Sequence, residues 1–132
     1  MDVDRAIRVA ETVLPGDGPL TQESDPRGQA ILAIRPSIEE EPEAVWTFVR
    51  RYGIHKDETL RHAIAVCLMQ ELLATHFETH FRQVVRLVRE SKTFADTFAR
   101  CEKYGQCAAP GNSEAYDDLL AFAQRYRREA VR

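Results

Sequence analysis

The sequence predicts an all-α protein in which about seven helices stack as a short helical repeat. Two segments nearly repeat at an offset of 32 to 33 residues, and each opens a helix: Asp25-Pro26-Arg27-Gly28-Gln29-Ala30-Ile31 and Asp57-Glu58-Thr59-Leu60-Arg61-His62-Ala63-Ile64. A period of roughly 20 to 50 residues built from helix pairs is typical of repeats whose units bury their apolar stripes only against neighbours. Apolar residues also recur at helical spacing along most of the chain, and no stretch alternates with a period of two.

The composition predicts one folded domain over residues 1–132. Of the 132 residues, 32 are Leu, Ile, Val or Phe, which is enough apolar surface to form a core. The formal net charge is −3, but residues 1–60 carry −5 and residues 61–132 carry +2. Because an acidic half repels phosphates, we expect another protein as the partner and disfavour nucleic acid.

The cysteines and the apolar runs predict a cytoplasmic protein, and the arginine content predicts a bacterial one. Three cysteines are an odd number, they form no CxxC pair, and no secretory leader pattern begins the chain. The longest apolar run, residues 63–69, is far shorter than the about 20 residues that cross a bilayer, so no membrane partner is expected. Arginine outnumbers lysine 15 to 3, an imbalance associated with GC-rich bacterial genomes.

The first helix is predicted to begin after an N-cap at Asp2 and to end before Pro15, with Val3, Ile7, Ala10 and Leu14 on one face. Residues 15–25 hold two prolines and two glycines and are predicted to form a loop. Asp25 followed by Pro26 is an N-cap with proline at the first helical position, where its missing N–H costs nothing. The second helix therefore begins there.

Prolines also mark the next boundary. Pro36 is expected to end or kink the second helix, and Pro42 to open a third that runs to Tyr52. Gly53 is predicted as the left-handed residue after that helix. The segment Ser37-Ile38-Glu39-Glu40 has the pattern of a capping box at this corner.

The fourth helix is predicted to begin after Asp57 and to lie in the middle of the stack. Its apolar residues surround the axis: Leu60, Ile64, Ala65, Cys67, Leu68, Met69, Leu72 and Leu73. The fifth helix begins with the capping box Thr75-His76-Phe77-Glu78. It carries the clearest apolar stripe of the chain: Phe77, Phe81, Val84, Val85 and Val88.

The sixth helix is predicted from Phe94, Phe98 and Cys101 and ends at Tyr104-Gly105. A loop follows, and Asn112 or Ser113 caps a seventh helix. The apolar face of that helix consists of Tyr116, Leu119, Leu120, Ala123 and Tyr126.

These helix pairs, two with three, four with five and six with seven, resemble HEAT-like repeats over residues 25 to about 130. The resemblance implies an α–α superhelical stack and a role as a scaffold or adaptor whose concave face holds another protein. One HEAT-like branch, the DNA alkylation-repair glycosylases, holds DNA in a basic groove lined by aromatic residues and an acidic residue. This chain departs from that branch, because Trp46 is its only tryptophan and the residue one turn later is Arg50.

His76 and His80 lie one helical turn apart and are close enough in rotation to share a metal ion. Metal hydrolases need HExxH, in which the glutamate directly follows the first histidine, but here Glu78 lies between the two histidines with Phe77 before it. Both histidines flank the apolar stripe of the fifth helix, so we expect them to line the edge of the core. A third ligand would have to come from His62, Cys101 or Cys107.

Single residues raise two further questions. Cys67 and Cys101 are expected to be small buried residues, whereas Cys107, in a loop, is expected to be exposed and reactive. Glu71 falls by rotation on an otherwise apolar face of the fourth helix. We expect its carboxylate to escape to solvent near the helix end; if buried, it must pair with an arginine or another donor.

Arg82, Arg86 and Arg89 line the face of the fifth helix opposite its apolar stripe. They can form a solvated face with weak pairs to Glu78 and Glu90, or a ridge that docks an acidic partner through bidentate hydrogen bonds. The C-terminal arginines would extend this ridge: Arg125, Arg127, Arg128 and Arg132.

We therefore expect a non-enzymatic interaction module, an adaptor or an inhibitor of the immunity-protein kind. No catalytic residue, cofactor, metal or small-molecule substrate is expected, because no nucleophile with a visible base, glycine-rich phosphate loop or paired-carboxylate motif occurs. Two alternatives remain open. One is a nucleic-acid-binding or DNA-repair-like HEAT protein using the ridge arginines, and the other is a metal-dependent enzyme using His76 and His80.

Overall fold

The protein is all-α, as predicted. The structure, a computed structural model, describes residues 2–14 and 25–130, and these contain helices and no strand. The helical segments are α1 (Val3–Val13), α2 (Pro26–Ile34), η1 (Arg35–Ser37), α3 (Pro42–Tyr52), α4 (Glu58–Ile64), η2 (Ala65–Met69), α5 (Gln70–Thr75), α6 (Phe77–Glu90), α7 (Lys92–Ala99), η3 (Gly105–Ala108) and α8 (Asn112–Ala130). The π-helical η2 joins α4 to α5, so the α-helices form seven rods in the described residues.

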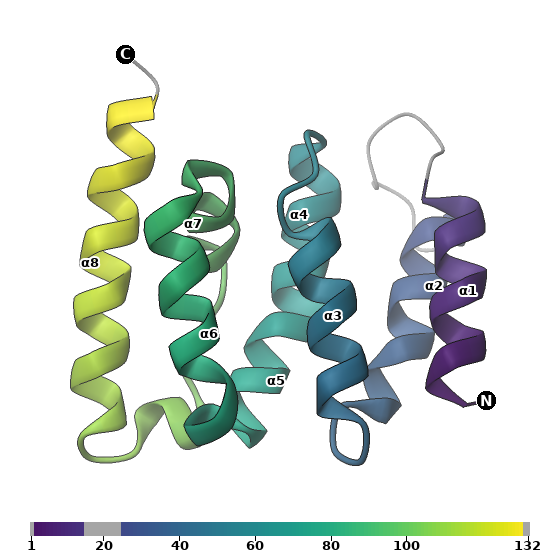
Figure 1. Cartoon of the computed structure of the whole chain (residues 1–132), viewed down its shortest axis with the longest axis horizontal. Coiled ribbons are helices and arrows are strands. Elements are labelled where there is room, and N and C mark those ends of the chain that lie inside the picture. Colours follow the sequence, from purple (N-terminus) through teal and green to yellow (C-terminus); the bar gives the residue numbers. More distant parts are fainter. Residues whose placement is uncertain (1, 15–24, 131–132) are drawn as a thin grey trace.

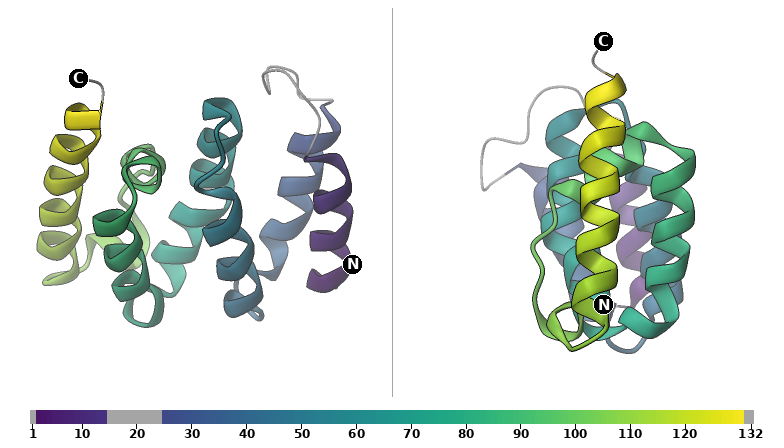
Figure 2. Two further views of the ribbon diagram at one scale, coloured as in Figure 1. Left: turned by 45° about the horizontal axis from the view of Figure 1, so that its top comes forward. Right: turned by 90° about the vertical axis from the view of Figure 1, so that its left-hand side faces the viewer.

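The rods stand side by side along the long axis of the molecule, from α1 at one end to α8 at the other (Figure 1). They form two rows, which the end-on view shows (Figure 2). Helix α1 contacts α3, and the indole of Trp46 on α3 lies 6.3 Å from the ring of His80 on α6. In the other row α2 contacts α4, and α4 contacts α7, while α8 closes the end of the stack against α6 and α7. The HEAT-like character of this stack stays a prediction.

The repeat seen in the sequence corresponds to a contact in the structure. Asp25 and Asp57 are the N-caps of α2 and α4: Asp25 accepts a hydrogen bond from the Arg27 N–H at 2.8 Å, and Asp57 accepts one from the Thr59 N–H at 2.9 Å. The buried Arg27 guanidinium lies 2.9 Å from the carboxylate of Asp25 and 3.9 Å from that of Asp57. The two matching caps thus share one cation. Asp2 caps α1, as predicted.

The central rod is buried nearly all round, which confirms the position predicted from its apolar residues. Its fully buried side chains are Leu60, Ile64, Leu68, Met69, Leu72 and Leu73. Replacing any one of these side chains by alanine would lower the free energy of unfolding by about 2–5 kcal/mol, because the surrounding side chains would fill the cavity only in part. This rod therefore anchors both rows of the stack.

The boundaries predicted from prolines are confirmed. Helix α2 ends at Ile34, just before a 3₁₀ turn that contains Pro36, and Pro42 is at the start of α3. The loop was predicted at residues 15–25, and its residues 15–24 lie outside the described part of the chain.

Three predictions at helix ends are wrong. Gly53 is right-handed, with φ −68°, and its hydrogen leaves room for Phe94: a Cβ there would lie 2.9 Å from that ring and 2.7 Å from the Val49 carbonyl oxygen. The capping box at Ser37–Glu40 does not form, since Glu41 is the N-cap of α3 and makes no side-chain cap. The sixth helix, α7, ends at Ala99 instead of Tyr104.

The capping box predicted at Thr75 is also absent. The Thr75 hydroxyl donates back to the Glu71 carbonyl at 2.9 Å, and α6 begins after His76 without a side-chain cap. The N–H of Phe77 instead donates to the Gln106 side-chain oxygen, 2.9 Å away. A residue 29 positions later in the chain therefore takes the part that a local capping residue was expected to take.

Among the described residues, no helix has the length and apolarity needed to cross a membrane.

Candidate functional site

The three arginines predicted to form a ridge all lie exposed on α6: Arg82, Arg86 and Arg89. The weak ion pairs expected with Glu78 and Glu90 do not form, and within the described residues no carboxylate lies within 4.0 Å of any of the three guanidinium groups. A guanidinium without an internal partner keeps its donors available for a carboxylate from outside. We call these three residues the arginine ridge.

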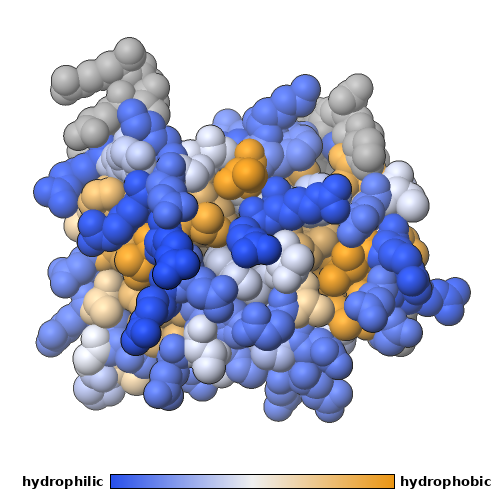
Figure 3. Space-filling model, viewed as in Figure 1, coloured by the Kyte–Doolittle hydropathy of each residue, from blue (hydrophilic) through white to orange (hydrophobic). Residues whose placement is uncertain are grey.

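A groove of about 490 Å³ lies beside the arginine ridge, between α6 and the start of α8. It is lined by Phe77, Glu78, Phe81, Arg82, Val85 and Asn112. Hydrophobic side chains are visible between α6 and α8, with strongly hydrophilic ones beside them (Figure 3). We call this hollow the α6–α8 groove.

The helical period of α6 explains why apolar and cationic residues meet in this groove. Val84 and Val88 point directly into the core and are fully buried. Phe81 and Val85 lie a fraction of a turn further round and are only partly buried. Glu78 and then Arg82 come next in rotation, so a carboxylate and a guanidinium both stand on the rim.

Aromatic rings hold the floor and the far wall in place. The rings of Phe77 and Phe81 stack with centroids 4.3 Å apart, and Phe81 lies 6.4 Å from Tyr116 of α8. The guanidinium of Arg89, near the end of α6, lies 4.9 Å from the centroid of the Phe122 ring of α8. Such stacked and cation–π contacts orient the side chains where α6 packs against α8.

Not all of the C-terminal arginines extend the ridge. Arg127 is bound to the carboxylate of Asp96 at 3.1 Å, in a cluster that also holds Arg61 at 2.8 Å and Arg100 at 3.0 Å. Burial works to raise the pKa of Asp96, but hydrogen bonds from Arg61 and Arg100 outweigh it and hold this pKa below its ordinary value. Arg125 is exposed. The side chains of Arg128 and Arg132 lie outside the described residues.

His76 and His80 are engaged with protein groups. His76 Nε2 lies 3.0 Å from the Ile38 carbonyl oxygen, and His80 Nδ1 lies 2.8 Å from the Thr79 hydroxyl. His80 is 1% exposed, so it is packed inside the core against Trp46 and does not merely line its edge. Its Nε2 lies 3.0 Å from a carboxylate oxygen of Glu43. The described residues contain no group of three side chains suited to a metal ion.

The cysteine predictions are partly wrong. Cys101 is buried, as expected, but Cys107 is buried as well, and this burial raises the pKa of its thiol to about 11. It is Cys67 that is partly accessible. All three thiols are unpaired.

Glu71 reaches solvent in part, with its side chain 27% exposed, but it is also paired. The Tyr104 hydroxyl donates a hydrogen bond to its Oε2 atom, and the Arg35 guanidinium lies 3.5 Å from the same oxygen. Burial and the neighbouring carboxylate raise the pKa of Tyr104. Neither partner was predicted, because Tyr104 is 33 positions away and Arg35 comes from the η1 turn after α2, the neighbouring rod of the same row. Only the unusual carboxylate on an apolar face pointed to this place.

Comparison of the chain with protein families, curated proteins and solved structures finds no match. The structure therefore defines a class only: a small all-α stack with a groove near one end that is lined by apolar residues and by Glu78 and Arg82.

Proposed function

We propose that this protein is a non-enzymatic protein–protein interaction module, and that the α6–α8 groove binds a partner segment with apolar and acidic side chains. One observation supports the proposal above the others. The arginine ridge has no carboxylate partner among the described residues, and it adjoins a groove floored by the partly exposed Phe81 and Val85.

The two kinds of side chain would contribute differently. An apolar side chain that is fully removed from water contributes about 1.5–3 kcal/mol, which favours a partner leucine or phenylalanine over the rings of Phe77 and Phe81. A carboxylate that meets Arg82 or Arg89 forms charge-assisted hydrogen bonds and sets the register of the partner. The arginine ridge thus favours an acidic segment whose carboxylates face Arg82 and Arg89 and lie away from Glu78.

The size of the groove limits the partner segment. The volume is only about 490 Å³, so the segment is short. The ordering cost of binding takes up part of the gain, and we expect a dissociation constant on the order of micromolar. An adaptor that exchanges partners suits this range.

We also propose that the protein resides in a reducing compartment, the bacterial cytoplasm. The three unpaired thiols support it, since cysteines in oxidising compartments are usually paired.

A library of displayed random peptides tests the function directly. We expect selection to enrich peptides that combine aspartate or glutamate with leucine or phenylalanine at helical spacing. Their binding should weaken at least tenfold in the R82E/R89E variant, because two attractions become repulsions, and should weaken with salt. The matched control is R50E, which reverses an exposed arginine on α3. Peptides that bind R82E/R89E as well as they bind the unchanged protein would refute the proposal.

A nucleic-acid-binding function is the second candidate, because basic side chains at the end of α6 and the start of α7 lie over aromatic rings of α8. Arg89 lies over Phe122, and Lys92 Nζ lies 5.4 Å from the Tyr126 ring centroid. These rings are already covered, however, and bases need a free aromatic face to stack on. Salt-sensitive binding of single-stranded oligonucleotides, lost in R82E/R89E, would favour this candidate over a protein partner.

A further inference from the structure

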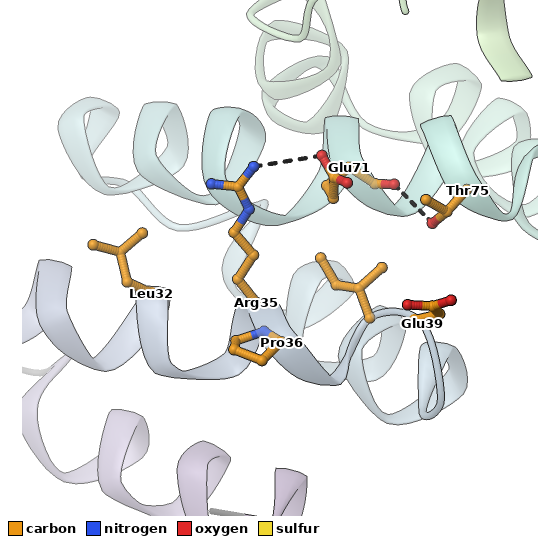
Figure 4. A pocket seen from close by; sticks show the side chains of 7 residues that line it. Leu32, Arg35, Pro36, Glu39, Glu71 and Thr75 are labelled. Carbon is orange, nitrogen blue, oxygen red and sulfur yellow. Dashed lines mark hydrogen bonds and ion pairs between the residues drawn. The ribbon is translucent and has the colours of Figure 1, made fainter. Parts of the chain in front are cut away.

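A second hollow lies where the α2–η1 corner meets α5 (Figure 4). Its volume is about 380 Å³, within the range of small-ligand pockets. It is lined by Leu32, Arg35, Pro36, Ile38, Glu39, Glu71 and Thr75. Leu32 stands at one end and Glu39 at the other, with Arg35 and Glu71 between them (Figure 4). We call this the corner pocket.

One carboxylate in the corner pocket is already oriented. Glu71 Oε2 accepts the Tyr104 hydroxyl and lies 3.5 Å from the Arg35 guanidinium. Among the described residues, the other oxygen, Oε1, accepts no hydrogen bond. An anchored carboxylate with an unused oxygen can receive a donor without first losing side-chain freedom.

The charges of the corner pocket do not balance. Glu71 and Glu39 bring two negative charges, whereas Arg35 brings one positive charge. The exposed Glu40 and Glu41 follow Glu39 directly, and within the described residues no cation pairs with any of these three consecutive glutamates. The side chains that line the pocket therefore carry a formal net charge of −1, which favours a cation.

The contact made by Arg35 is loose. Its side chain is 50% exposed, and 3.5 Å is longer than the 2.7–2.9 Å typical of a charge-assisted hydrogen bond. An exposed pair of this kind contributes little, so a better-placed cation can share Glu71 with Arg35.

The remaining wall of the corner pocket is apolar. Leu32 is 44% exposed, which is unusual for a large aliphatic residue in this structure, and Pro36 is exposed next to it. Ile38 is buried behind them. A short alkyl chain lying along Leu32 and Pro36 would bury surface that water now covers.

We propose that the corner pocket binds an alkylammonium or alkylguanidinium group. Its alkyl chain contacts Leu32 and Pro36, and its cation donates to Glu71 with Glu39 supplying the second negative charge. Such a group exists as a free amine and as a lysine or arginine side chain of a peptide. The sequence prediction that no small-molecule ligand is evident is revised by this proposal, which does not depend on the α6–α8 groove.

Titration followed by ¹H–¹⁵N correlation spectra tests the proposal, using n-butylammonium as the probe. We expect saturable shifts of the backbone amides of Ile38, Glu39, Glu71 and Thr75. The neutral n-butanol and the anionic butyrate should not produce them. If butyrate shifts these amides as strongly, the pocket binds anions through Arg35, and the proposal is wrong.

Variants test which carboxylate receives the cation. E71Q should weaken binding of n-butylammonium about tenfold or more, because a charge-assisted hydrogen bond becomes a neutral one. E39Q leaves the bond between Tyr104 and Glu71 intact and should weaken binding about two- to fivefold, so it serves if E71Q fails to fold. E90Q on α6 should bind normally. Equal affinities of E39Q, E90Q and the unchanged protein, or shifts that do not saturate, would overturn the assignment.

A second probe, Nα-acetyl-lysine N-methylamide, distinguishes the two sources. Saturable shifts with both probes show that the alkyl cation is sufficient, whatever carries it. Shifts with the lysine derivative alone show that the pocket also reads a peptide backbone. Both results support the proposal, and shifts with neither probe refute it.

Discussion

Asp96 pairs with three arginines, and D96N tests how much its charge contributes to stability. Three guanidinium groups from α4, α7 and α8 converge on its two oxygens, at 2.8 Å for Arg61, 3.0 Å for Arg100 and 3.1 Å for Arg127. Asparagine keeps the shape of the side chain but removes the negative charge and turns one acceptor into a donor. The substitution therefore leaves three cations facing a neutral group.

The magnitude follows from the exposure of each pair. The Arg61 side chain is 11% exposed, and losing its charged partner costs about 1.5–3 kcal/mol. Arg127 is 42% exposed and Arg100 still has Glu58, so these two add roughly 1 kcal/mol together. We expect the free energy of unfolding to fall by about 2–4 kcal/mol, which lowers Tm by roughly 8–15 °C in a chain of this length.

Urea unfolding at pH 7 and at lower pH measures the effect and its origin. Because the pKa of Asp96 is lowered in the folded protein, its stabilisation is complete above the ordinary value of 3.8 and is lost as the pH falls through the lower folded value. The difference between wild type and D96N should therefore shrink in acid. D118N, which alters an exposed aspartate of α8, is the matched control and should stay within about 0.5 kcal/mol of wild type. A D96N protein as stable as D118N at pH 7 would refute this reasoning.

Two further predictions concern backbone packing and thiol reactivity. G53A should lower the free energy of unfolding by about 1–3 kcal/mol in urea, since the added Cβ would lie 2.9 Å from the Phe94 ring, whereas nothing lies within 4 Å of the corresponding position at Gly28 in α2. G28A should instead stabilise the protein by about 0.5–1 kcal/mol, and equal effects of the two alanines would contradict the packing argument. With an aromatic disulfide reagent, the folded protein should react first at Cys67, and Cys107 should react only on unfolding. Mass spectrometry of the labelled peptides checks the order, and rapid labelling of Cys107 in the native protein would show that its burial is wrong.

Local signals in the sequence were reliable where the interaction itself is local. The aspartate caps at Asp2, Asp25 and Asp57 were predicted correctly because each cap bonds an N–H two or three residues later. The boundary at Pro42 was predicted correctly because a proline restricts its own backbone. These signals depend on neighbours along the chain and need no knowledge of the fold.

Predictions failed where a distant residue took over the expected role. At the start of α6 the Gln106 side chain receives the Phe77 N–H, so the local box at Thr75 is not needed. Gly53 looked like a left-handed helix end, but it is required for the approach of Phe94, which is 41 positions away. Neither replacement has a local signature.

In the candidate sites, too, the local features were predicted and the contacts between distant segments were not. The exposed position of Arg82, Arg86 and Arg89 follows from the period of one amphipathic helix, and it was predicted. The α6–α8 groove beside them was not, because its far wall comes from α8. The corner pocket was not predicted either, because its lining comes from both η1 and α5.

The sequence by itself determined that this protein is helical, where most of its helices begin, and which rod is buried all round. Capping and apolar periodicity act within a turn or two of helix, so they can be read along the chain. Only the tertiary structure decided that Cys107 is buried, that Arg27 joins two caps, and that Tyr104 anchors Glu71. These outcomes depend on which helix faces meet, because burial and ion pairing are set by neighbours in space and not by neighbours in sequence.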